Sequence, residues 1–225
     1  MKNVNSFRKR RGKRLASQLS ALANVLGRDV QILDVGGRKD YWLNIELERV
    51  THITLLNYDA KEIMDDECPQ NGVGFSNEVG DARNLSTYSD GSIDFVHSNS
   101  VIEHVGPWQD MECMASEMLR VGLGGWMQTP SWMFPLEPHF RAPFLHWFGQ
   151  PLRRSMLSLS PYYRKLGVAE RRYHIDRINL LTRCEVEALF PTAEIYTERA
   201  IFPKSYVAHW MPTKEQLVQV QKRAD

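Results

Sequence analysis

Short apolar segments alternate with stretches of helical spacing along most of this chain. From Val30 onward, five apolar segments are expected to form strands, near residues 30–35, 52–57, 73–79, 93–98 and 125–129. A helix is predicted from about Trp108 to Val121, because methionine, alanine and leucine recur on one face, and Gly122 to Gly125 should end it. This alternation is typical of a parallel sheet with crossover helices.

The two ends of the chain add further elements to this pattern. Leucines at helical spacing follow a basic run, so an amphipathic helix is predicted within residues 1–28, ending near Gly27. Beyond residue 179, the pattern predicts a helix over 182–190 and two strands over 193–199 and 205–210. The last two strands are expected to form an antiparallel pair.

Residues 131–179 interrupt the alternation. The first part of this segment is rich in aromatic residues and prolines and has no clean period, and a basic, tyrosine-bearing stretch follows. A segment of this length is too long for an ordinary connection between a strand and a helix. We therefore predict an insertion after the fifth strand that forms a substrate-binding lid with short helices.

Composition and cysteine usage indicate the general class of the protein. A chain of 225 residues with 43% hydrophobic content can bury one sizeable core, so a single domain over 1–225 is expected. Cys68, Cys113 and Cys184 are odd in number and far apart, which favours reduced thiols in a cytoplasmic protein. No apolar run approaches the roughly 20 residues that span a bilayer, and no secretory signal is recognisable.

The basic run at Arg8–Arg11 has two interpretations. It could contact nucleic acid or an anionic membrane surface, or it could be a solvated helix start beside an apolar face. The second interpretation is favoured, because the formal net charge of the whole chain is only +1. A nucleic-acid partner is thus not expected, but the basic run is compatible with contact to a membrane surface. The sequence does not indicate the oligomeric state.

Polar residues follow four of the predicted strands. These residues are Asp34 with Gly36 and Gly37, then Asn57, then Asp81 with Ala82, and finally Ser98 with Asn99. Ligands of open α/β sheets bind beyond the carboxyl ends of the strands, so these positions should converge on one crevice. Each could instead be a turn or capping residue, since Asp, Asn and Ser favour those places.

This order of motifs resembles the class I S-adenosylmethionine (SAM)-dependent methyltransferases, over roughly Val30 to Pro130. The resemblance implies an α/β fold with a Rossmann-like, seven-stranded, mostly parallel sheet, helices on both faces and SAM as the cofactor. It assigns the methionine part of SAM to Asp34, Gly36 and Gly37, the ribose hydroxyls to Asn57, and the adenine to Asp81 and Ala82. Ser98 and Asn99 would complete the cofactor site.

The first motif and the second strand end depart from the family pattern. Arg38 and Asp40 stand where the family has its second and third glycines. Asn57 replaces the usual acid, so it can accept a hydrogen bond but brings no charge, and Asp59 could substitute for it. Because no G-x-G-x-x-G follows the first strand, a dehydrogenase is not expected.

Methyl transfer to oxygen needs an aligned acceptor and a group that takes the hydroxyl proton. The candidates are Glu103 and His104 after the fourth strand, and Glu137, His139 and His146 in the insertion. We favour His139 as the general base, with Glu137 orienting it or binding the acceptor and Glu103 near the cofactor. Glu137, His139 and an aspartate could instead bind a divalent metal, but no metal site is assigned.

The leading hypothesis is a SAM-dependent O-methyltransferase for a small hydroxylated molecule such as a sugar or a glycolipid precursor. Residues 98–101 lack the Asn/Asp-Pro-Pro-aromatic motif typical of enzymes that methylate base nitrogens. The cysteines also do not fit the nucleophile of pyrimidine C5 enzymes. A nucleic-acid methyltransferase guided by the basic helix and a non-catalytic SAM-fold binding protein remain the alternatives.

Overall fold

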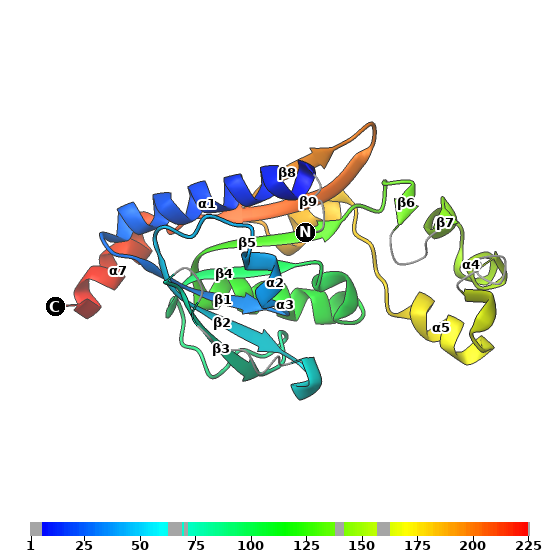
Figure 1. Ribbon diagram of the computed structural model, residues 1–225, viewed down its shortest axis with the longest axis horizontal. Coiled ribbons are helices and arrows are strands. Elements are labelled where there is room, and N and C mark those ends of the chain that lie inside the picture. The colour runs from blue at the N-terminus through cyan, green and yellow to red at the C-terminus, as the bar shows by residue number, and fades with distance from the viewer. Residues whose placement is uncertain (1–5, 63–68, 70–71, 138–141, 157–162, 225) are drawn as a thin grey trace.

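A seven-stranded sheet forms the centre of the molecule (Figure 1). The computed structural model describes residues 6–62, 69, 72–137, 142–156 and 163–224. All strands run parallel except β9, which is antiparallel to both of its neighbours. This confirms the predicted fold class. In sheet order the strands are β3 (Gly74–Val79), β2 (Val50–Asn57), β1 (Val30–Val35), β4 (Ile93–Asn99), β5 (Gly122–Pro130), β9 (Pro203–Trp210) and β8 (Glu194–Arg199).

Helices cover both faces of this sheet. On one face, α3 (Trp108–Val121) and α6 (Arg183–Leu189) pack on apolar side chains of β1, β4 and β5. On the other face, only the single turn α2 (Lys39–Trp42) connects β1 to β2, so the long helix α1 (Ser6–Leu26) provides most of the cover. Of the leucines that the spacing predicted for the apolar face of α1, Leu15, Leu19 and Leu22 are buried and Leu26 is partly buried. A further helix, α7 (Lys214–Ala224), follows β9.

α3 ends before Gly122 as predicted, but the strand expected over 125–129 begins already at Gly122, so the glycines at 122–125 lie inside β5. α3 ends at Val121, and Gly122 already has an extended backbone with φ −94° and ψ 126°. A Cβ atom at Gly125 would lie 2.1 Å from the ring of Trp210. The missing side chains therefore let β5 pass directly beneath the indole of Trp210, which explains why glycines occupy a buried strand.

The insertion lies to one side of the sheet, beyond the carboxyl ends of the parallel strands (Figure 1). It contains short helices, and it buries a small cluster of its own made of Leu145, Tyr163 and Ile178. Its elements are β6 (Leu136–Glu137), β7 (Ala142–Pro143), the 3-10 turns η3 (Leu145–Trp147) and η5 (Tyr163–Lys165), α4 (Gln150–Met156) and α5 (Val168–Asp176).

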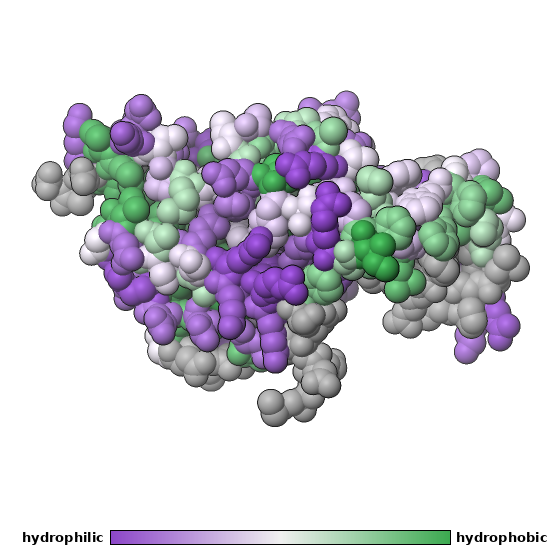
Figure 2. All heavy atoms as spheres, turned by 90° about the horizontal axis from the view of Figure 1, so that it is seen from above, coloured by the Kyte–Doolittle hydropathy of each residue, from purple (hydrophilic) through white to green (hydrophobic). Residues whose placement is uncertain are grey.

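Much of the apolar surface of the insertion stays exposed. Figure 2 shows green, apolar residues across this lobe, whereas strongly hydrophilic residues lie over the centre of the molecule. Among the described residues of the insertion, the exposed large hydrophobic side chains are Trp132, Met133, Leu136, Phe144, Trp147, Phe148, Leu152, Val168 and Tyr173. None of the described helices is both long and apolar enough to cross a bilayer.

Candidate active site

A cavity of about 560 Å³ opens at the carboxyl ends of β1, β4 and β5 and at the amino end of the antiparallel strand β9. Its walls come from the start of α1, the turn after β1, α2 and the first residues of the insertion. Asp34, Gly36, Gly37 and Asn99 line this cavity, so four of the predicted cofactor residues share one space. This is the position where an open α/β sheet binds its ligands.

The turn at Gly36 and Gly37 requires glycine at both positions. Gly36 has φ +71°, and a Cβ atom there would lie 2.5 Å from a methyl carbon of Val101. A Cβ atom at Gly37 would lie 2.0 Å from Oδ2 of Asp34. Asn57 donates a hydrogen bond from Nδ2 to the carbonyl of Gly37 at 3.0 Å. The turn thus presents bare backbone to the cavity, and Asn57 holds it from behind.

Asp34 is buried and forms a pair with His97 of β4. Its Oδ1 lies 2.6 Å from Nδ1 of His97, and its Oδ2 accepts a hydrogen bond from Nε1 of Trp42 at 2.7 Å. The rings of Tyr41 and Trp42 flank the imidazole, with centroids 4.8 and 4.7 Å away. Because the carboxylate faces Nδ1, it favours the tautomer that carries its proton there and leaves Nε2 as an acceptor.

His97 lines the cavity and was missed from the sequence. It is fully buried, and its Nε2 has no hydrogen-bond partner in the described part of the chain. Buried polar atoms are normally bonded, so an unsatisfied one beside a cavity points to a ligand or water. The available signal was a histidine in the middle of the strand predicted over 93–98, directly after Phe95 and Val96. Burial also raises the pKa of the neighbouring Tyr41, which keeps that phenol protonated.

Arg11 of α1 reaches into the same region and ties the helix to the sheet. Its Nη1 donates to Oδ1 of Asn99 at 2.8 Å and to Oε1 of Gln128 at 2.7 Å. Its Nε and Nη2 donate to the two carboxylate oxygens of Glu198 at 3.0 and 2.5 Å. The interpretation of residues 8–11 as a solvated helix start was therefore wrong for Arg11, although Arg8, Lys9 and Arg10 are exposed.

The Arg11–Glu198 pair also changes the titration of the carboxyl group. Both side chains are largely buried, with 10% and 7% of their surfaces exposed. Burial acts to raise the pKa of Glu198, but the hydrogen bonds and positive charge of Arg11, together with Ser205, lower it overall. Glu198 thus stays ionised at neutral pH and accepts the hydrogen bonds that fix α1 over the cavity.

Asp81 and Ala82 lie at the end of β3 and do not line the cavity. The carboxylate of Asp81 accepts hydrogen bonds from Nε and Nη2 of Arg83, the latter at 2.6 Å, and these lower the pKa of Asp81. Ala82 packs against the core beneath α3. The carboxylate already has a cationic partner, and its contact with adenine remains a prediction.

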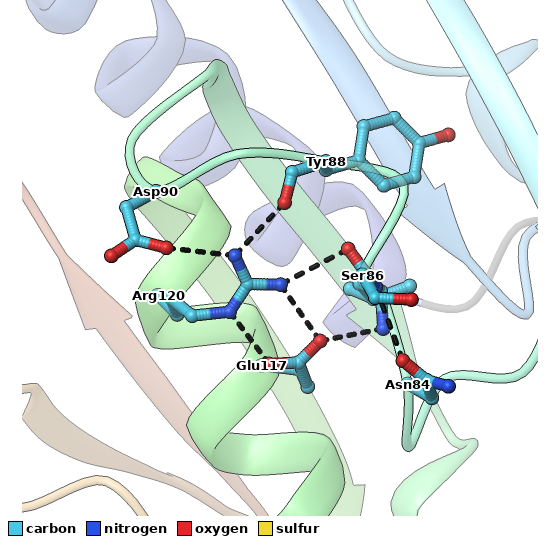
Figure 3. Close-up of polar contacts among 7 residues, drawn as sticks. Asn84, Ser86, Tyr88, Asp90, Glu117 and Arg120 are labelled. Atoms are coloured by element: carbon cyan, nitrogen blue, oxygen red, sulfur yellow. Dashed lines mark hydrogen bonds and ion pairs between the residues drawn. The ribbon is translucent and has the colours of Figure 1, made fainter.

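The loop that follows Asp81 is fixed to α3 by a clamp of charged groups (Figure 3). Arg120 donates from Nη2 to the carbonyl of Leu85 at 3.0 Å and from Nη1 to that of Tyr88 at 2.8 Å. Glu117 accepts a hydrogen bond from the amide of Leu85 at 2.6 Å and is bound by Arg120. The edge of the sheet predicted to hold adenine is therefore rigidly connected to α3.

Two of the predicted residues, Ser98 within β4 and Glu103 just after it, form hydrogen bonds to neighbouring strands. Ser98 is buried and donates from Oγ to the carbonyl of Val35 at 3.0 Å, so it joins β4 to β1. Glu103 is also buried and accepts a hydrogen bond from Oγ1 of Thr129 at 3.0 Å. Neither residue lines the cavity. The sequence placed both near the cofactor because it could not distinguish a side chain facing the crevice from one facing the next strand.

The predicted catalytic residues of the insertion are only partly described. Glu137 lies on β6 and pairs with Ala142 through its backbone, whereas its side chain and the whole of His139 lie outside the described residues. His146 is buried, and its Nε2 lies 2.9 Å from the carbonyl of Trp132, as expected for a structural histidine. Among the described residues, no three His, Cys, Asp or Glu side chains gather as metal ligands would.

Comparison with known proteins decides the family. A family model described as a methyltransferase domain matches residues 7–159, more than half of the chain. The chain belongs to this methyltransferase domain family. It is a SAM-dependent methyltransferase. No curated protein sequence matches it.

Solved methyltransferase structures share its fold. A magnesium protoporphyrin IX methyltransferase from Synechocystis, crystallised with S-adenosylhomocysteine, has 12% identity and a TM-score of 0.56, covering 95% of this chain and 90% of its own. A SAM-dependent methyltransferase from Methanosarcina mazei has 16% identity and a TM-score of 0.50, with 86% and 98% covered. A putative methyltransferase from Haloferax volcanii, in complex with the Trm112 activator, has 12% identity and a TM-score of 0.52, with 91% and 94% covered.

The residues of this methyltransferase fit its cofactor. Gly36 and Gly37 line the cavity without side chains, so a ligand can approach their backbone directly. Gly36, Gly37 and Asn99 would hold the methionine part, with Asp34 and Asn57 fixing the turn from behind. When bound, SAM supplies the electrophilic methyl group. The chain itself would position the cofactor.

Proposed function

We propose that this methyltransferase methylates a hydroxyl group of a small hydroxylated acceptor, such as a sugar or a glycolipid precursor. The supporting observation is the mixed lining of the cavity on the side away from the glycine turn. Gln128 and Ser131 offer amide and hydroxyl groups there, and Phe134 and Leu136 of the insertion offer apolar surface. Such a lining suits a molecule whose rings pack on apolar side chains while its hydroxyls are hydrogen-bonded.

A panel of sugars and other polyols, both neutral and acidic, incubated with SAM, tests this proposal. Release of S-adenosylhomocysteine should accompany an O-methyl product, identified by mass spectrometry and by the carbon chemical shift of its methyl group. If the only methylated products carry the new group on nitrogen or carbon, the proposal is wrong.

Two histidines are proposed to compete for the role of general base. His139 remains the first candidate, with Glu137 as its partner, because both follow directly on β5 along a proline-braced segment. The Asp34–His97 pair is the second, because its Nε2 is free to accept a proton inside the described residues and its Nδ1 is fixed by a carboxylate. Glu103 has no place in this proton transfer, since it bonds to Thr129 away from the cavity.

The substitutions His139→Ala and His97→Asn distinguish the two candidates. Loss of a positioned base should lower turnover by about 10²–10⁴-fold and remove the acidic limb of the pH–rate profile. The affinity for S-adenosylhomocysteine should stay within about twofold in the variant that lacks the true base. If neither variant shows this combination, neither histidine is the base.

A nucleic-acid acceptor is a less favoured proposal, because Arg11 is used internally and only part of the basic run faces solvent. A polyanionic substrate would bind with a steep dependence on salt, whereas a neutral acceptor would show almost none.

We also propose a cytoplasmic location, because the described cysteines, Cys113 and Cys184, are exposed free thiols. Cell fractionation checks that location.

A further inference from the structure

The cavity carries more positive than negative charge. Arg8, Arg11, Arg38 and Lys204 line it, against Asp34 and Asp40. Arg11 is neutralised by Glu198, and Asp34 is engaged by His97 and Trp42. Within the described residues, no carboxylate lies within ion-pair distance of Arg8, Arg38 or Lys204. Positive charge that the protein leaves uncompensated in a concave site favours an anionic ligand.

Two of these cations, Arg8 and Lys204, meet at one end of the cavity. The ammonium group of Lys204 lies 4.1 Å from the centroid of the Phe7 ring, next to Arg8 on α1. Partial burial and then the charges of Arg11 and Arg8 lower the pKa of Lys204, while Glu198 opposes this effect. Holding like charges together in a half-buried place costs free energy, and a bound anion would offset that cost.

This end of the cavity is the one away from the glycine turn. In the sheet, β4 and β5 separate β9, which carries Lys204, from β1. The carbonyl of Lys204 accepts a hydrogen bond from the amide of Ser131, the first residue of the insertion, at 3.0 Å. Arg38, by contrast, directly follows the glycine turn and lies on the cofactor side. Arg8 and Lys204 therefore face the space that the proposed function gives to the acceptor.

We propose that Arg8 and Lys204 bind an anionic group of the acceptor, either a phosphate or a carboxylate. This inference rests on the proposed function and narrows it: the acceptor is a small hydroxylated acid, such as a sugar phosphate or a sugar acid. Its anionic group is held at the α1–β9 end of the cavity. Its hydroxyl group is directed toward β5, where Gln128 lies.

Calorimetry on the full chain saturated with S-adenosylhomocysteine tests this site, with pyrophosphate as the phosphate probe and citrate as the carboxylate probe. The wild-type protein should bind at least one of them, and which one it prefers identifies the anionic group. Lys204→Gln and Arg8→Gln should each weaken that binding by about tenfold or more, and Lys204→Arg should restore it. Arg10→Gln is the matched control, because Arg10 also contacts Phe7 but does not line the cavity.

Three results would overturn the inference. The first is that neither probe binds the wild-type complex. The second is that Arg10→Gln weakens probe binding as much as Lys204→Gln does. The third is that Lys204→Gln and Arg8→Gln lose affinity for S-adenosylhomocysteine itself. The last result would mean that the cations hold the carboxylate of the cofactor. These experiments measure anion binding and do not identify the methylated atom. Their outcome is therefore independent of the product analysis that tests O-methylation.

Discussion

The sheet and the insertion bury their apolar side chains to very different extents. On both faces of the sheet, large clusters combine several strands with α1 and α2 or with α3 and α6. The insertion has three buried residues in its own cluster and many exposed aromatic and aliphatic side chains. A region with few buried contacts opens at lower free energy than a packed core. The sheet therefore fixes the cofactor side of the cavity, while the insertion can adjust on the acceptor side.

The largest expected effect comes from the buried charge pair that fixes α1 to the sheet. Arg11→Met leaves Glu198 buried without its cation, which should lower the free energy of unfolding by about 3–5 kcal/mol. Urea denaturation at pH 7 measures this. Arg10→Met, on the exposed face of the same helix, should change stability by no more than about 0.5 kcal/mol.

A second substitution at Glu198 sharpens that result. Because the cost arises from the stranded carboxylate, adding Glu198→Gln to Arg11→Met should recover part of the lost stability. If the double variant is as unstable as the sum of the two single variants, the pair contributes through packing and not through its charge.

Truncation of one leucine in each region compares the two cores directly. Leu22→Ala, in α1 above the sheet, should lower the free energy of unfolding by about 2–5 kcal/mol. Leu145→Ala, also buried but in the insertion, should mainly speed proteolysis within residues 131–179, with a much smaller change in the melting temperature. Equal losses of global stability would show that the insertion unfolds together with the sheet.

The cofactor side should be sensitive to a single methyl group. Gly36→Ala adds a Cβ atom against Val101 at a residue with positive φ, so the affinity for S-adenosylhomocysteine should fall by about tenfold or more. Gly27 also has positive φ, but no atom lies within 4 Å of the Cβ atom that Gly27→Ala would add. That control should lose some stability and keep its cofactor affinity. Titration calorimetry measures the affinity, and scanning calorimetry measures the stability.

The smallest expected effect concerns the clamp in Figure 3. Hydrogen bonds from Arg120 and from the amide of Leu85 lower the pKa of Glu117 against the opposing effect of burial. A lowered carboxyl pKa contributes stability that is complete above the ordinary value of about 4.5 and is lost as the pH falls through the lowered pKa. The stability difference between the wild type and Glu117→Gln should thus be constant near pH 7 and shrink below pH 4.5, as measured by denaturation at several pH values.

The sequence was sufficient for the central strands β1, β2 and β4 because each carries its own apolar run and a polar residue at or near its end. Asp34, Gly36 and Gly37 were found for the same reason, since they adjoin each other in the chain. The Arg11–Glu198 pair joins residues 187 positions apart, and nothing local distinguishes Arg11 from its basic neighbours. Asp81 was incompletely predicted for a different reason. Its partner Arg83 is only two residues away, but a motif match alone does not reveal that Arg83 donates hydrogen bonds to the carboxylate.

The way α1 completes the sheet has a consequence for synthesis of the chain. Gln18 of α1 donates hydrogen bonds to the carbonyls of Gly125 and Trp210, the latter 192 residues away. At about 5–20 residues per second, a ribosome needs roughly 10–40 s to add the partner of a helix that is already formed. During that time the leucines of α1 lack the part of their cover that comes from β5 and β9. The nascent chain is therefore expected to expose an apolar helix and to depend on a chaperone until β9 emerges.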